Sequence, residues 1–192
     1  MKIIVISFLL LLIITPILSQ TKVTIKFKDL TEIKDLVASK GMELQSLKTL
    51  VQYNSDSIAE VFVHHQNKIS HFYFLDTKID SNLKTAQKGI GSKVYTKGDI
   101  AIFHVHFYSN YDIKYLEPEN YISKREVFIK RNNEDYAYNM GCIDGSGCVG
   151  IKKRLKKFFH DCPKLIKEIR KNKIKDWEII KIVNLYNTLC AE

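Results

Sequence analysis

The spacing of apolar residues changes near Gly150 from every second residue to about every 3.6 residues, and this change constrains the fold more than any other feature. Alternation of apolar and polar residues favours a half-buried β-strand, whereas apolar residues three and four apart favour an amphipathic helix. Alternation prevails from Gln20 to about Met140, as in Val23–Phe27. We therefore predict an α+β protein: a mainly antiparallel β-rich body over residues 20–149, and a helical tail over residues 150–192 packed on it as one globular unit.

Three β-hairpins are predicted inside the body, because β-branched and aromatic runs flank short turn sequences. The paired runs are 58–65 with 69–75, 94–95 with 100–108, and 126–131 with 134–138. Their turns contain Gln66-Asn67-Lys68, Lys97-Gly98-Asp99 and Asn132-Asn133. The last of these suits a two-residue turn, because Asn tolerates a positive φ.

The segment Asp29–Lys40 fits two predictions equally well. Ile33, Leu36 and Val37 have helical spacing, and Asp29 with Glu32 could form a capping box. The same residues could also form the second strand of a hairpin with Val23–Phe27. Two further stretches, 76–92 and 110–120, are predicted as loops because they carry Asp, Asn and Gly.

The N-terminus is typical of a secretory signal peptide over residues 1–19. Lys2 precedes an apolar run from Ile3 to Ile14, then Pro16, and a small residue at Ser19. The run is shorter than the roughly 20 residues that span a bilayer, so a transmembrane anchor is the weaker interpretation. We expect cleavage after Ser19, no transmembrane segment in the mature chain, and a periplasmic or secreted location. The chain holds only 8 Gly and 3 Pro, and this low content argues against a low-complexity chain.

The tail concentrates the charge of the protein. Residues 150–192 hold 12 Lys/Arg against 5 Asp/Glu, a net of +7, whereas residues 20–192 hold 29 against 21, a net of +8. Ile151, Leu155, Phe158 and Phe159 form an apolar stripe at helical spacing. A second helix is predicted after Asp161-Cys162-Pro163, where proline suits the first turn. A third begins near Trp177, after a turn over 172–175.

The tail also resembles a known group of proteins. Lys156-Lys-Phe-Phe-His-Asp-Cys-Pro-Lys-Leu-Ile-Lys-Glu-Ile169, followed by Ile182-Val-Asn-Leu-Tyr-Asn-Thr-Leu-Cys190, is similar to the C-terminal end of small exported proteins of the Bacteroidota. The resemblance covers about 40 residues and is loose over Thr24–Asp29 and Phe128–Arg131. It implies a β-rich body, a helical tail and export, and it transfers no catalytic residue. This chain departs from the group in its extra pair, Cys142 and Cys148.

An exported chain allows its four cysteines to form disulfides, in three possible pairings. If 163–171 and 177–189 form a helical hairpin, Cys162 and Cys190 meet at its open end, and closing this loop stabilises the fold by about 3.6 kcal/mol. Cys142 and Cys148 lie in a glycine-rich loop whose closure contributes about 2.3 kcal/mol. We predict the pairing 142–148 and 162–190. A redox or metal-binding pair is the weaker alternative, because no Cys-x-x-Cys spacing is present.

Two histidines are the candidates for metal chemistry. His104 and His106 lie two apart on a predicted strand and so share a face, and His64, His65 or His71 could add a third ligand. Ala101, Phe103, Val105 and Phe107 on the other face are suited to a core, so the histidine face is also explained as the wetter side of a sheet. Gly145-Ser146-Gly147 lacks the spacing of a nucleophile elbow, and no dinucleotide, phosphate-loop, zinc-protease or calcium-loop motif occurs. We expect no cofactor.

The basic run is the candidate contact surface. Its cations are Lys152, Lys153, Arg154, Lys156 and Lys157. Such a run is ordinarily a solvated helix face, and its functional interpretation is contact with an anionic partner. The expected function is therefore an exported, non-enzymatic binding or structural protein of the cell envelope. Its partner would be an anionic envelope polymer, a lipid headgroup or another envelope protein. Nucleic acid is disfavoured because export separates the two. A metal-dependent enzyme centred on His104 and His106 is the alternative, and pairing through an exposed sheet edge is a third hypothesis.

Overall fold

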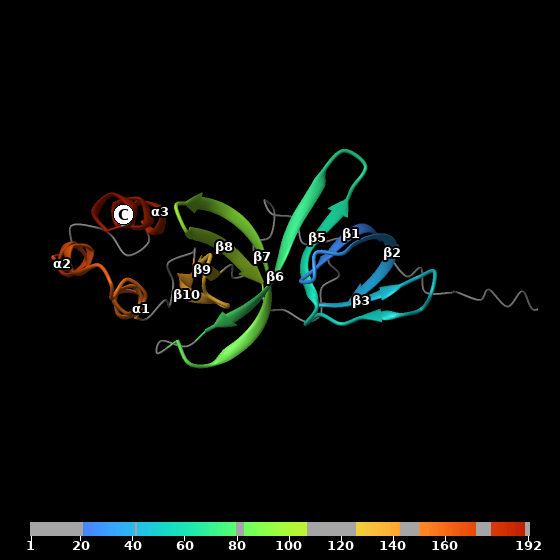
Figure 1. Ribbon diagram of the computed structural model, residues 1–192, viewed down its shortest axis with the longest axis horizontal. Helices are drawn as coiled ribbons and strands as arrows, with labels where there is room; N and C mark the ends of the chain where they lie inside the picture. Colours follow the sequence, from blue (N-terminus) through green and yellow to red (C-terminus); the bar gives the residue numbers. More distant parts are fainter. Residues whose placement is uncertain are drawn as a thin grey trace, which may run out of the picture.

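The computed structural model describes residues 21–40, 42–79, 83–106, 126–142, 150–171 and 178–190. The α+β prediction is confirmed: the described elements are strands followed by three C-terminal helices (Figure 1). The strands are β1 (Thr21–Phe27), β2 (Glu32–Lys40), β3 (Glu43–Ser46), β4 (Gln52–Tyr53), β5 (Ile58–His64), β6 (Ile69–Lys78), β7 (Ala86–Lys97), β8 (Ile100–His106), β9 (Glu126–Arg131) and β10 (Tyr136–Cys142). The helices are α1 (Ile151–Phe158), α2 (Pro163–Arg170) and α3 (Ile179–Leu189).

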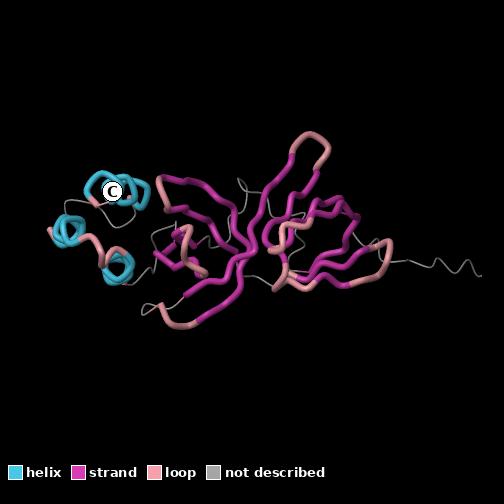
Figure 2. The backbone as a smooth tube through the Cα atoms, in the orientation of Figure 1, coloured by secondary structure: helices cyan, strands magenta, loops and turns pink. Residues whose placement is uncertain are grey.

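All the described strands form one sheet, in the order β10-β9-β8-β7-β6-β5-β1-β2-β3-β4. Neighbours in this order are antiparallel, and an additional parallel pairing joins β10 to β6 and so closes β6–β10 into a ring. We call β1–β5 with the start of β6 the first lobe, and β6–β10 the second lobe. Figure 2 shows the two groups of strands side by side, with the helices beyond the second lobe.

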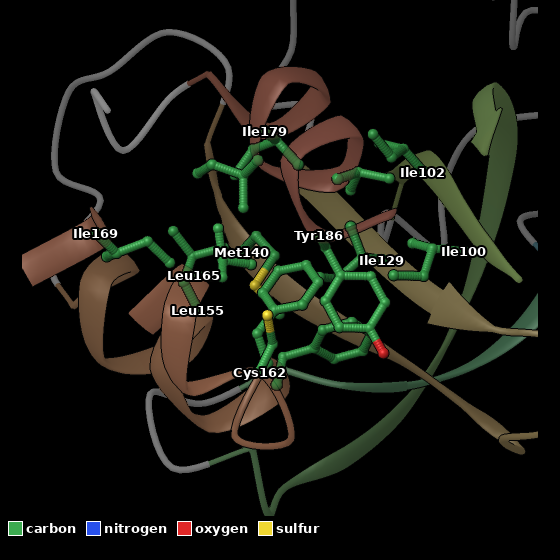
Figure 3. Close-up of a cluster of buried hydrophobic side chains, with 14 of the residues drawn as sticks. Ile100, Ile102, Ile129, Met140, Leu155, Cys162, Leu165, Ile169, Ile179 and Tyr186 are labelled. Atoms are coloured by element: carbon green, nitrogen blue, oxygen red, sulfur yellow. The ribbon is translucent and has the colours of Figure 1, made fainter. Parts of the chain in front are cut away.

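The strands of the second lobe bury both faces. On β8, Ala101, Phe103 and Val105 join a cluster inside the ring, whereas Ile100 and Ile102 point outward and pack against the helices. Figure 3 shows these outward residues meeting the apolar stripe of the helices. The buried stripe includes Leu155, Phe159, Leu165, Ile182 and Val183. Alternation along one strand therefore supplies two cores, and the helical tail covers the outer one.

The first lobe has its own core, built on the inner face of β1, β5 and β6. Its fully buried members include Val23, Ile25, Val61, Val63 and Phe72. Asp35 on β2 is also buried, where Oδ2 accepts from the Tyr53 hydroxyl at 2.6 Å and Oδ1 from the Leu36 N–H at 2.8 Å. Burial alone would raise the pKa of Asp35, but hydrogen bonds from Ser46, Tyr53 and Leu36 outweigh burial and lower it.

The helix prediction for Asp29–Lys40 was wrong, and the hairpin alternative is confirmed. Lys26 pairs with Glu32 and Thr21 with Val37 in an antiparallel ladder. Asp29 does cap a turn, but not a helix N-terminus. Its Oδ1 accepts hydrogen bonds from the N–H and the hydroxyl of Thr31, at 3.0 and 2.7 Å. Strand geometry prevails because β1 lies between β2 and β5, so pairing on both edges outweighs the local helical spacing.

The loop predicted over 76–92 was wrong over residues 76–78 and 86–92, which are strand. β6 continues to Lys78, and β7 begins at Ala86 and pairs with β6 on one edge and β8 on the other. One of the glycines that suggested a loop, Gly91, lies instead in a packed part of the sheet. A Cβ at Gly91 would lie 2.8 Å from Leu75 Cδ1, so a larger residue would require the Leu75 side chain to shift. The segment 110–120 lies outside the described residues.

All three predicted hairpins are confirmed, with one change in turn length. β5–β6, β7–β8 and β9–β10 pair as antiparallel neighbours. In the last hairpin β10 begins at Tyr136 rather than at Glu134, so residues 132–135 connect the strands in place of a two-residue turn. The β7–β8 turn contains Gly98 at φ +60, and a Cβ there would lie 2.1 Å from Asn187 Oδ1 of α3. This glycine therefore lets the third helix dock against the turn.

The disulfide between Cys162 and Cys190 is confirmed, with a Cα–Cα distance of 5.8 Å. It joins the residue before α2 to the residue after α3. The predicted bond between Cys142 and Cys148 involves side chains outside the described residues, as does the predicted signal peptide over 1–19. Within the described ranges, no helix combines the length and the apolar character that crossing a membrane requires.

Candidate functional site

The helical tail is held against the sheet by an ion-pair cluster around the largely buried Arg131 of β9. Its guanidinium donates from Nη1 and Nη2 to the two carboxylate oxygens of Asp161, each at 2.9 Å. The Tyr186 hydroxyl of α3 donates to Asp161 Oδ2 at 2.7 Å, and Arg131 Nη1 also donates to that hydroxyl at 2.8 Å. Burial alone would raise the pKa of Asp161, but the bonds from Arg131 and Tyr186 lower it. We call these three residues the Arg131 cluster.

A second polar contact ties α1 to the sheet and uses one of the predicted contact residues. Arg154 Nη1 donates to Asn139 Oδ1 at 2.7 Å, and the Asn139 amide donates in turn to Glu126 Oε2. Asn139 is buried on β10. Arg154 therefore orients the tail on the sheet, and its cation is directed inward rather than toward a partner.

The remaining cations of α1 and α2 form the basic face. Residues 150–171 contain nine Lys/Arg and two Asp/Glu, and one of those acids, Asp161, is bound to Arg131. The other acid is Glu168, whose Oε1 lies 3.9 Å from Lys171 Nζ. Six of the cations are exposed: Lys153, Lys157, Lys164, Lys167, Arg170 and Lys171. Two cations of the predicted run, Lys153 and Lys157, are thus brought together with three cations of α2 and with Lys171 just after it, which sequence reasoning had not assigned to the surface. Lys152 and Lys156 of the predicted run are half-buried.

The predicted histidines do not converge. His104 pairs with Ser92 on β7, whereas Tyr73 pairs with Gly91, so His104 and Tyr73 lie on opposite faces of the sheet. His71 lies two residues from Tyr73 and shares its face, so it cannot join His104 around one ion. The His106 side chain lies outside the described residues. No group of three His, Cys, Asp or Glu able to hold a metal occurs among the residues that the structure describes.

His71 instead belongs to a stack of rings on the outer face of the first lobe. Its ring lies 4.1 Å from that of Phe62 and 4.4 Å from that of Tyr73, and Nε2 lies 2.9 Å from Glu60 Oε2. Burial lowers the pKa of His71, although Glu60 acts to raise it. Lys26 covers the Phe62 ring at 5.1 Å, so the ring faces are occupied within the protein. This stack packs the sheet and leaves little ring surface for a ligand.

A cleft of about 540 Å³, which no local sequence pattern predicted, lies where the two lobes join. β5 pairs along one edge of β6 as far as Tyr73, and β10 takes over that edge at Asp76. The cleft lies at this change of partner, and charged side chains of both signs line it. Asp76 is bonded to Lys88 at 2.9 Å, and Lys28 approaches it at 3.5 Å. Its charges largely satisfy one another, so the cleft favours no single class of ligand.

Comparison of the chain with protein-family models, with curated proteins and with solved structures finds no match.

Proposed function

We propose that this protein is an exported, non-enzymatic binding protein of the cell envelope that contacts an anionic partner through the basic face of α1 and α2. Export rests on the N-terminal pattern and on the resemblance of the tail to exported Bacteroidota proteins. Membership of that group is part of the same proposal. The partner is an anionic envelope polymer, with an anionic lipid surface as the competing outcome of the test.

One observation supports this proposal above the others. The apolar stripe of α1 and α2 packs against the sheet and is not available to a partner, since Leu155, Phe159 and Leu165 are fully buried there. What the two helices leave on the surface is a set of exposed cations with little acidic compensation. A surface of one sign attracts polyanions over a distance of about 8–10 Å at ordinary salt.

The test compares two variants that remove the same charge from different places. The first replaces Lys153, Lys157, Lys164 and Lys167 of the basic face by Gln. The control replaces Lys34, Lys84, Lys97 and Lys130 of the β body by Gln. Binding to immobilised heparin, used as a model polyanion, and to vesicles with and without anionic lipid is measured between 50 mM and 500 mM salt.

We expect the first variant to lose binding and the control to retain most of it. At about 1 kcal/mol for each lysine near an anionic surface, four substitutions weaken binding by up to about three orders of magnitude at low salt. Binding by the unmodified protein should fall steeply as salt rises. Equal losses in the two variants would show that net charge alone, rather than the basic face, is responsible. Recovery of an exported protein whose N-terminus is Gln20 tests the export.

A further inference from the structure

Three buried polar atoms without a hydrogen-bond partner gather at one end of the first lobe. They are Thr21 Oγ1, His65 Nε2 and Ser70 Oγ, among the six such side-chain atoms in the described part of the chain. Register explains why they meet. Val63 pairs with both Val23 and Ser70, and Thr21 and His65 lie two residues from that pair, so all three point to the inner face of the lobe.

Buried polar atoms in folded proteins are almost always hydrogen-bonded, so a group of three without partners calls for a ligand or water. Other polar atoms close by are satisfied. The ring of His64, on the outer face of the same hairpin, lies with Nε2 2.8 Å from the Thr24 hydroxyl. On the outer face the His64 ring has a hydrogen-bond partner within the protein, whereas the three buried atoms on the inner face have none.

Two of the three residues, Thr21 and His65, line a pocket of about 520 Å³ at the tip of the β5–β6 hairpin. Its lining is Thr21, Lys22, His64, His65, Gln66, Asn67 and Lys68. The volume is within the range of small-molecule sites. Among the described residues no Asp or Glu lines it, whereas two lysines, two imidazoles, two amides and a hydroxyl do. Every one of these side chains can donate a hydrogen bond, and the lysines disfavour a cationic ligand.

We propose that this pocket binds a small ligand through an oxyanion, a carboxylate, sulfate or phosphate group held by Thr21 and His65, and that Lys22 in the lining favours its negative charge. An oxyanion accepts several hydrogen bonds at once and is the natural complement of a lining rich in donors and free of acids. The site lies on the first lobe, whereas the helices lie beyond the second lobe (Figure 1). It is therefore independent of the basic face, and either proposal can fail alone.

The test titrates the mature protein with glucuronate, sulfate and inorganic phosphate, with glucose as the neutral control. Binding is followed by calorimetry and by the NMR signals of the His65 ring. We expect at least one oxyanion to bind tenfold or more tightly than glucose and to shift those signals. The three probes also separate a carboxylate from a sulfate or phosphate preference. Binding of none of them, which leaves water as the only occupant, would overturn the proposal.

Two variants connect binding to these atoms. Thr21→Val keeps the shape and removes the hydroxyl, and it should weaken oxyanion binding about tenfold to a hundredfold. Because the hydroxyl has no partner in the unbound protein, the same change should leave the melting temperature unchanged or raise it. Ser92→Ala is the matched control, since Ser92 Oγ is also buried without a partner but lies outside the pocket. Equal affinity of Thr21→Val and the unmodified protein would exclude Thr21 as a ligand contact and refute the site as proposed.

Discussion

Replacement of Asp161 by Asn should loosen the helical tail, because Asp161 neutralises the guanidinium that joins β9 to α3. Arg131 is only 12% exposed, and its other near carboxylate, Glu134, approaches no closer than 4.0 Å. The Asn side chain can accept at one atom only, so the two ionic hydrogen bonds from Arg131 become at most one bond from the guanidinium to a neutral amide oxygen. The variant therefore leaves a largely buried cation without its anion.

The expected cost is about 2 kcal/mol. Hydrogen bonds to charged groups contribute about 1.5–3 kcal/mol each, but Asp161 is 37% exposed, so solvent screening reduces the sum. For a chain of this size, a loss of that magnitude lowers the melting temperature by about 4–8 °C. Tyr186→Phe removes a single hydroxyl from the same cluster and should cost about 1 kcal/mol.

The measurement is urea unfolding of Asp161→Asn, Arg131→Met and the double variant. Methionine retains an apolar stem but removes the guanidinium, whose carbon lies 5.0 and 4.9 Å from the ring centres of Phe158 and Tyr186. Loss of these two contacts is common to Arg131→Met and the double variant. If the ion pair joins the tail to the sheet, the losses in the free energy of unfolding of the two single variants will add up to about 1.5–2 kcal/mol more than the loss in the double variant. Additive effects, within about 0.5 kcal/mol, would refute the reasoning.

The same pair predicts a pH dependence. The pKa of Asp161 is lower in the folded protein than in the unfolded chain, so its contribution is complete above the unfolded pKa and is lost as the pH falls through the folded one. The stability difference between the unmodified protein and Asp161→Asn should therefore be full at pH 7 and shrink as the pH falls below about 4. An undiminished difference at pH 2 would contradict the assignment.

Two further predictions concern the helical tail. Replacing both Cys162 and Cys190 by Ala should lower the free energy of unfolding by about 3.6 kcal/mol through the entropy of the unfolded chain, measured by urea unfolding of the variant against the oxidised protein. Lys164→Glu should raise it by about 0.3–1 kcal/mol, because Lys164 is exposed in the first turn of α2, where the helix dipole favours an anion and no acid is present. The same substitution at Lys171, past the end of α2, is its control and should not stabilise.

The hairpins could be predicted because their signals are local. In β5–β6 and β7–β8, alternation and turn residues lie within a few positions of one another, and antiparallel pairing needs nothing more. Asp29–Lys40 was undecided for a matching reason. Its local pattern fits both structures, and the pairing of β1 with β5, some 40 residues along the chain, decides between them.

Longer-range features escaped prediction because no residue near them records the partner. β7 resembled a loop in its glycines, and Gly91 is explained by the Leu75 side chain of the neighbouring strand β6. The parallel pairing of β10 with β6 joins residues 60 apart and leaves no mark on either strand. In the basic run all five charges could be read from the sequence. The inward direction of Arg154 could not be predicted, because it depends on the position of Asn139 on β10, to which Arg154 donates a hydrogen bond.

The construction of the tail bears on why its surface is basic. Helices of eight residues, such as α1 and α2, are marginal alone, and neither has an acid in its first turn or a side-chain cap. Their stability comes from the buried stripe, the disulfide and the Arg131 cluster, and the exposed lysines add mutual repulsion. Lys164 shows the conflict most clearly, since an acid there should stabilise α2 and weaken contact with a polyanion. If Lys164→Glu gains stability and loses heparin binding together, the charge serves a partner rather than the fold.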